Sequence, residues 1–124
     1  MSLPASQRGF TLIELIAILV ILGILASIAV PKYYDITREA QNRAALQAVA
    51  EGKSRLSMTY ARLFLENGAP PDATSLVASV GATTSLGDYT LNFSTIVASS
   101  DIKINASGKL GVQGVNSGVW VLPK

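Results

Sequence analysis

The chain has 124 residues, enough for one small domain, and a formal net charge of +2 from ten Lys and Arg against eight Asp and Glu residues. It contains no His and no Cys, so the commonest general base, thiol nucleophiles and the usual transition-metal ligands are missing. No phosphate-binding loop is present, because "GVQGVNSG" at 111–118 lacks both the spacing and the lysine. We therefore expect no enzyme activity, no cofactor and no metal site, and a Lys or carboxylate active site is a distant alternative.

Near the start of the chain lies a long apolar block. From Phe10 to Val30, only Thr11, Glu14 and Ser27 interrupt a run of 21 residues, with Gly23 inside it. As a helix this block is about 31 Å long, enough to cross a hydrocarbon layer of roughly 30 Å. The sequence therefore predicts a membrane-spanning helix over 10–30.

Two simpler interpretations compete with this one. A cleavable secretory signal usually has an apolar region of about 7–15 residues that ends in a small-x-small site. Here the charge and the small residue, Arg8 and Gly9, stand before the apolar block, so cleavage at Gly9 leaves the helix on the mature chain. A plain single-span anchor fits the apolar run but does not explain Glu14.

Glu14 places a carboxylate about 6 Å into this helix, where a charge needs a partner or access to the interface. It can reach the interface along its own side chain. Alternatively, cleavage between Gly9 and Phe10 exposes a new α-amino group, and Glu14 pairs with that amine on a neighbouring subunit. One helical turn separates Phe10 from Glu14, so this pairing fixes an axial stagger between subunits.

The segment "RGFTLIELIAILVILGILASIAVPKYYD" at 8–35 resembles the amino-terminal segment of bacterial type IV pilins and of the related pseudopilins of type II secretion. In that family a short basic leader ends in Gly, the next residue is an N-methylated Phe, a Glu follows one turn later, and a helix-bending Pro ends the span. The matching positions are Gly9, Phe10, Glu14 and Pro31, with Gly23 at the usual mid-span glycine.

The resemblance implies a processing and assembly route. A prepilin peptidase removes the leader, residues 1–9, and methylates the amine of Phe10, so this chain is a substrate. The precursor sits in the inner membrane, where the pilus assembly machinery works on it. The subunits then form a helical homo-oligomer at the cell surface whose core consists of the 10–30 helices. Such filaments serve adhesion, motility or DNA uptake.

Residues 31–66 are predicted to form the amphipathic half of the same helix. Pro31 removes one backbone hydrogen bond and predicts a kink, since the helical pattern resumes at once. Tyr33 and Tyr34 suit an interfacial aromatic belt and packing within a filament equally well. Apolar and small residues recur at three- and four-residue steps and predict a packed face: Ile36, Ala40, Ala44, Ala45, Val49, Gly52, Leu56, Tyr60 and Leu63.

The other face of this helix is charged. Residues 32–65 carry six positive and three negative side chains, a local surplus of three positive charges. A basic helix can bind nucleic acid or anionic lipid. We favour a solvated helix face with intrahelical ion pairs, because nothing else in the sequence supports nucleic-acid binding.

The helix is predicted to stop at "ENGAPPD", residues 66–72. Asn67 and Gly68 can adopt left-handed conformations at a C-cap, and Pro70 and Pro71 prevent continuation. Residues 67–124 are then rich in Ser, Thr, Gly and β-branched residues, which is typical of a small β-rich head.

Within this head, "YTLNF" at 89–93 and "DIKIN" at 101–105 alternate like strands, with Tyr89, Leu91 and Phe93, then Ile102 and Ile104, on one face. "NASGKL" at 105–110 is predicted to be a hairpin turn and "GVWVL" at 118–122 a closing strand. "TSLVASVG" at 74–81 fits a helical turn or a strand.

Three or four antiparallel strands can bury an apolar face, including Trp120, against the helix stripe from Ala45 to Leu63. The predicted fold class is α+β: a long membrane-spanning N-terminal helix packed on a small C-terminal antiparallel sheet, in the lollipop arrangement of pilins. Asp72, Asp88 and Asp101 could contribute to a Ca²⁺ site, but scattered solvation of loops is the favoured interpretation.

The chain departs from the resembled family in having no cysteine, because many pilins carry a disulfide in their carboxy-terminal region. "PKYYDITREAQNRAALQAVAEGKS" at 31–54 resembles the mannose-sensitive haemagglutinin type of pilin. A pseudopilin of type II secretion, which also lacks the disulfide, is the main alternative, although the calcium-binding loop of that class is not found. A minor pilin that acts as a binding or adhesin head is a further alternative.

Overall fold

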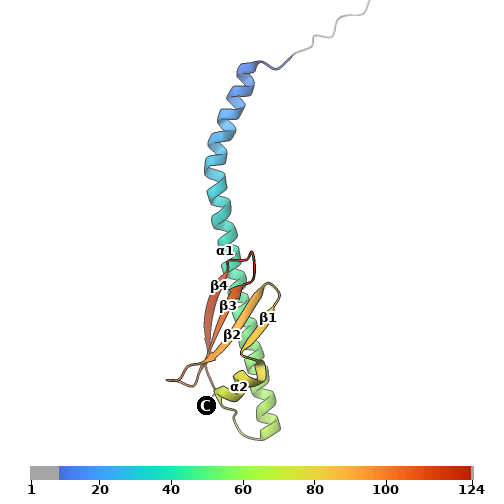
Figure 1. Cartoon of the computed structure of the whole chain (residues 1–124), viewed down its shortest axis with the longest axis vertical. Coiled ribbons are helices and arrows are strands. Elements are labelled where there is room, and N and C mark those ends of the chain that lie inside the picture. The colour runs from blue at the N-terminus through green and yellow to red at the C-terminus, as the bar shows by residue number, and fades with distance from the viewer. Residues whose placement is uncertain (1–8, 124) are drawn as a thin grey trace, which may run out of the picture. The chain divides into compact units, whose positions relative to one another are not determined.

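The structure is a computed structural model that describes residues 9–123. It contains two helices, α1 (Leu12–Asn67) and α2 (Ala73–Val80), and four strands, β1 (Thr83–Leu86), β2 (Tyr89–Thr95), β3 (Ile102–Gly108) and β4 (Val115–Trp120) (Figure 1). The predicted α+β combination of one long helix and an antiparallel sheet is confirmed. The chain divides into two compact units, Met1–Ile36 and Thr37–Lys124.

The first unit consists of the amino-terminal part of α1 and the residues before it. The helix begins at Leu12, two residues later than the predicted start at Phe10, and continues through Pro31. Its large apolar side chains are exposed, from 45% for Ile18 to 74% for Leu12. The unit therefore has no core of its own among its described residues, and its apolar surface needs cover from outside the chain.

In the second unit, the remainder of α1 packs on one face of the sheet. Ala45, Val49, Gly52 and Leu56 from the predicted stripe are buried, as is Ala48, and Tyr60 and Leu63 pack partly buried at the edge of the core. The prediction was wrong for Ile36, Ala40 and Ala44, which are exposed. The hydrogen bonds of the helix with the β-rich part of the chain begin at Gln41, after Ile36 and Ala40, and Ala44 faces an open groove.

The helix approaches the sheet closely at Gly52. A Cβ at this position would lie 3.1 Å from Ile104 Cγ2 and 3.4 Å from Leu91 Cδ1. The absence of a side chain therefore lets the buried aliphatic side chains of β2 and β3 reach the helix.

The sheet is antiparallel throughout, with the strands in sequence order β1-β2-β3-β4. The predicted alternation is confirmed: Tyr89, Leu91 and Phe93 in β2 and Ile102 and Ile104 in β3 are buried, and Phe93 pairs directly with Ile104. Trp120 at the end of β4 is also buried, as predicted.

The predicted turn "NASGKL" was wrong. Residues 105–108 continue β3, and the turn follows over Lys109–Val112, closed by a 2.9 Å hydrogen bond from the Val112 N–H to the Lys109 carbonyl. Gly111 has φ of +88° at the third position of this turn, where type II geometry favours glycine. The closing strand accordingly begins at Val115 and ends at Trp120, earlier than the predicted 118–122.

The segment between α1 and β2 contains residues 74–81, for which the sequence fitted either a helical turn or a strand. Gly68 follows the end of α1 with φ of +67°, as the predicted C-cap requires. "TSLVASVG" is helical and forms most of α2. Strand β1, which the sequence did not reveal, pairs with β2 through a hairpin that turns at Gly87 and Asp88, with Gly87 at φ of +55°.

Candidate assembly site

Glu14 is held at the start of α1 by a reciprocal pair of hydrogen bonds. The Thr11 backbone N–H donates to Glu14 Oε2 at 2.8 Å, and the Glu14 N–H donates to the Thr11 hydroxyl at 3.3 Å. This is a capping box, in which the two residues satisfy each other's free N–H groups at the first helical turn. The sequence interpretation missed it, although the signal, Thr11 three residues before Glu14, was present.

The capping box fixes the position of the carboxylate. Glu14 Oε2 accepts the Thr11 N–H, while Oε1 accepts no hydrogen bond from any residue in the range 9–123. The positive end of the helix dipole also favours a carboxylate at this place. The other carboxylate oxygen therefore remains open to a cationic partner from outside the chain.

Gly9 and Phe10 precede α1 in a non-helical, exposed segment. Phe10 is 79% exposed, and nothing lies within 4 Å of a Cβ built on Gly9. A peptidase can approach a non-helical, uncovered backbone of this kind. The remainder of the predicted leader, residues 1–8, lies outside the described residues.

Gly23 and Pro31 lie within α1. A Cβ at Gly23 would meet nothing within 4 Å, so this glycine has no packing reason within the chain. Gly and Pro weaken a helix by about 1 and about 3 kcal/mol respectively relative to Ala. Ser27, the remaining polar side chain of the span, donates its hydroxyl to the Ile24 carbonyl at 2.7 Å. The span thus satisfies its own polar groups apart from the open oxygen of Glu14.

Helix α1 is long and apolar enough to cross a membrane. It contains an 18-residue window with a mean hydropathy of 2.8, none of which is buried within the chain. The large apolar side chains point in all directions around the helix, since those at consecutive positions such as Leu12 and Ile13 are both exposed. An apolar solvent or neighbouring helices must surround such a surface.

The charged face of α1 carries ion pairs between residues four positions apart. Arg43 pairs with Glu39 at 3.0 Å, Arg55 with Glu51 at 3.2 Å and Arg62 with Glu66 at 2.8 Å. All six side chains are at least 39% exposed. Exposed pairs of this kind contribute little to stability and are typical of a solvated helix face.

The three aspartates considered for calcium do not meet in one site. Asp88 lies in the β1–β2 hairpin turn, and Asp101 Oδ1 accepts the Leu122 N–H at 3.1 Å. Asp72 precedes α2, where the Ser75 hydroxyl lowers the pKa of its carboxyl group. Among the described residues, no group of three or more Asp, Glu, His or Cys side chains could hold a metal ion.

The amino-terminal segment around Gly9, Phe10 and Glu14 matches a known family motif. Residues 4–30 match the model of the prokaryotic N-terminal methylation motif, which contains Gly9, Phe10 and Glu14. The resemblance to the type IV pilins is therefore confirmed.

Curated relatives of the chain carry pilin names. A fimbrial protein of Neisseria meningitidis serogroup A is 33% identical over 110 residues, covering 83% of this chain and 62% of that protein. The type IV major pilin protein PilE of Neisseria gonorrhoeae is 42% identical over 85 residues, covering 67% of this chain and 47% of the pilin. A fimbrial protein of Pseudomonas aeruginosa is 43% identical over 63 residues, which is 42% of this chain and 41% of that protein. The chain thus spans about half the length of these relatives, and no solved structure matches it.

Proposed function

We propose that this chain is a structural subunit that polymerises into a type IV pilus-like surface filament. The observation that carries the proposal is the uncovered apolar helix of the first unit, with the Glu14 carboxylate fixed by Thr11 at its amino-terminal end. A helix of this kind is stable in a membrane or among its own copies. Outside the cell, a filament surrounds the helix with its own copies.

Processing precedes assembly in this proposal. The precursor rests in the inner membrane through α1, and a prepilin peptidase cuts between Gly9 and Phe10 and methylates the new amine. The non-helical, exposed segment at Gly9 and Phe10 supports this order, because the peptidase needs to unwind nothing. The assembly machinery of the inner membrane then moves the processed subunit into the filament.

Register between subunits comes from charge pairing. The amine of Phe10 on one subunit pairs with Glu14 of its neighbour, which shifts the two helices by four residues, or about 6 Å. Within an apolar core the two charges compensate each other's loss of hydration, whereas either charge alone is costly. A misplaced subunit leaves both charges unpaired, so the pair selects one axial position.

The relatives with pilin and fimbrial names support a pilus over a pseudopilus of type II secretion. A minor pilin with a binding head requires the same processing and differs in abundance along the filament. We favour a solvated charged face of α1 over a nucleic-acid interface, because ion pairs such as Arg43–Glu39 and Arg62–Glu66 lie on that face.

The test is the intact mass and amino-terminal sequence of protein sheared from the cell surface, with electron microscopy of the same fraction. We expect chains that begin at N-methylated Phe10 in long thin fibres. Processed chain confined to the inner membrane would favour a pseudopilin, and trace amounts restricted to fibre tips a minor pilin. A chain that retains Met1 in the mature fraction would refute the proposal.

A further inference from the structure

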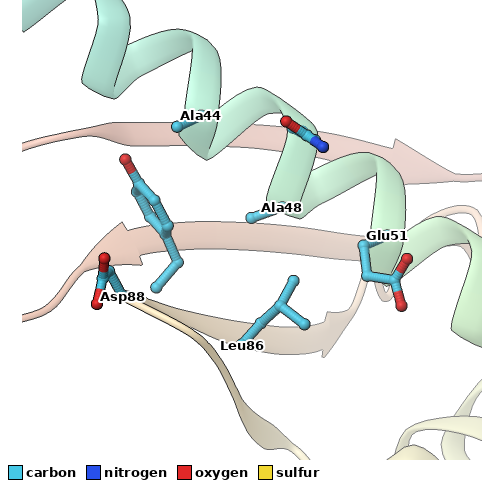
Figure 2. A pocket seen from close by; sticks show the side chains of 7 residues that line it. Ala44, Ala48, Glu51, Leu86 and Asp88 are labelled. Carbon is cyan, nitrogen blue, oxygen red and sulfur yellow. The ribbon is translucent and has the colours of Figure 1, made fainter.

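An open groove lies in the second unit between α1 and the β1–β2 hairpin. Its volume is about 440 Å³, which is large enough for an extended side chain. Ala44 and Ala48 of α1, Leu86 of β1 and the ring of Tyr89 provide apolar walls, and Figure 2 shows Glu51 and Asp88 at opposite ends of these walls. The groove therefore combines apolar walls with a carboxylate at each end.

The negative charge of this groove is only partly compensated within residues 9–123, since the Lys109 ammonium group donates to the Ser85 hydroxyl and to the carbonyl of Gly87, next to Asp88. The Asp88 carboxylate makes no hydrogen bond or ion pair with any residue of the described range, and its backbone carbonyl alone is engaged, by the Lys109 N–H at 2.8 Å. Glu51 uses Oε1 for Arg55 at 3.2 Å. The Tyr89 hydroxyl is already committed to the Gln41 carbonyl. Apolar walls that end in an unpaired carboxylate fit the alkyl chain and ammonium group of a lysine.

Lys53 presents such a side chain on the opposite flank of α1. It stands two residues after Glu51, and two residues on a helix are about 200° apart. The Lys53 side chain lies beside β4, because a Cβ on Gly118 of this strand would lie 3.1 Å from Lys53 Cε and 3.4 Å from its Nζ. Lys53 is exposed, and residues 9–123 supply no ion-pair or hydrogen-bond partner for its ammonium group. It cannot enter the groove of its own chain, because the helix stands between them.

We propose that Lys53 of one subunit inserts into the groove of the next, with its alkyl chain against Ala44, Ala48 and Leu86 and its ammonium group at the Asp88 carboxylate. The inference rests on the proposed filament. The contact joins two different surfaces of identical chains, and such heterologous contacts generate open helical assemblies. It gives the second unit its own determinant of subunit order, separate from that of the membrane helix.

Zero-length carbodiimide cross-linking of intact, unmodified filaments tests the contact directly, because this reagent joins an ammonium group only to a carboxylate that touches it. We expect a dimer band whose cross-linked peptide joins Lys53 to Asp88. Filaments that yield Lys53 linked to other carboxylates, or no dimer at all, would overturn the inference and leave the proposed function standing. If the unmodified chain forms no filaments, the proposed function fails first.

Charge reversal supplies a second, independent test in assembling cells. Lys53→Glu and Asp88→Lys are each expected to lower the yield of sheared filaments at least tenfold, and the double variant is expected to restore most of it. Lys103→Glu is the matched control, since Lys103 is also exposed but lies on β3, away from both flanks of α1. Equal losses in the control, or no rescue in the double variant while the chain still accumulates as a folded precursor, would refute the pairing.

Discussion

The Tyr89 hydroxyl donates a 2.7 Å hydrogen bond to the backbone carbonyl of Gln41, 48 residues earlier in the chain. Tyr89 opens β2, and Gln41 lies in the first turns of α1 that contact the β-rich part of the chain. The side chain of Gln41 contributes as well, because its Oε1 accepts the Gln113 N–H at 3.1 Å. This junction closes one end of the helix–sheet layer without a disulfide.

Tyr89→Phe removes the hydroxyl from this junction and keeps the buried ring. We expect a loss of about 1 kcal/mol in the free energy of unfolding, the usual net contribution of a partly buried hydrogen bond. Thermal unfolding of the full chain in detergent, followed by circular dichroism, measures it. Tyr34→Phe is the control, because that ring is 70% exposed. Equal effects of the two variants would contradict the role given to the Tyr89 hydroxyl.

Gly114→Ala should disturb the same junction by overpacking it. A Cβ on Gly114 would lie 2.2 Å from the Gln41 carbonyl oxygen and 2.8 Å from the Tyr89 hydroxyl, too close for either to remain in place. We expect destabilisation of about 1–3 kcal/mol, more than for Tyr89→Phe. The same unfolding assay applies. Gly23→Ala, where a Cβ meets nothing within 4 Å, should leave the unfolding of the second unit unchanged.

Ser57→Ala removes the partner of the single tryptophan. Trp120 Nε1 donates to Ser57 Oγ at 3.0 Å, and this contact links β4 to α1. We expect a loss of about 1 kcal/mol and a shift in the Trp120 emission maximum, because a partly buried indole N–H loses its acceptor. Ser54→Ala, on an exposed part of the same helix, is the control. An unchanged emission spectrum would argue against this hydrogen bond.

Periodicity predicted those parts of the fold in which one face is buried. The alternation of Leu91 and Phe93 in β2, and of Ile102 and Ile104 in β3, identified the core-facing side of the sheet correctly. The position of the β3–β4 turn was wrong because "NASG" has turn-forming residues, yet pairing with β2 extends β3 to Gly108. Strand β1 (Thr83–Leu86) was not predicted. None of its side chains is fully buried, so its sequence shows no alternation of apolar and polar residues.

Only part of the assembly site could be predicted from the sequence. The isolated carboxylate of Glu14 in an apolar run indicated a charge that needs a partner, and this role stays a prediction. Its hydrogen bond with Thr11 was not predicted, although Thr11 stands three residues before Glu14, which is the spacing of a capping box. The groove at Asp88 could not be predicted at all, since it depends on the position of the β1–β2 hairpin beside α1.

Acid should weaken the start of α2 through Asp72. The Ser75 hydroxyl holds the pKa of the Asp72 carboxyl below its ordinary value, so the folded state favours the ionised form. The resulting stabilisation is present above the pKa of the unfolded chain and is lost as the pH falls through the lower pKa of the folded chain. We expect Asp72→Asn to lower the melting temperature near pH 6 and to have little effect near pH 2–3, because Asp72 is then protonated in both states. A constant difference between these pH values would contradict the assignment.

Glu14 has two separable roles, and two substitutions distinguish them. Glu14→Ala removes both the capping box and the charge, whereas Glu14→Gln keeps an acceptor for the Thr11 N–H, since Gln serves at this position of a capping box, and removes only the charge. If the carboxylate pairs with the Phe10 amine of a neighbour, both variants should be processed after Gly9 and both should fail to form filaments.

If capping alone matters, Glu14→Gln should form filaments at the level of the unmodified chain and Glu14→Ala should not. Thr11→Ala completes the set, because it retains the charge and removes the hydroxyl that accepts the Glu14 N–H at 3.3 Å. We expect it to assemble, with at most a loss of about 1 kcal/mol in helix stability. Amino-terminal sequencing of the membrane fraction measures processing, and the yield of sheared fibres measures assembly. Normal fibres from Glu14→Gln would remove charge pairing from the mechanism and leave the apolar surface of α1 as the source of cohesion.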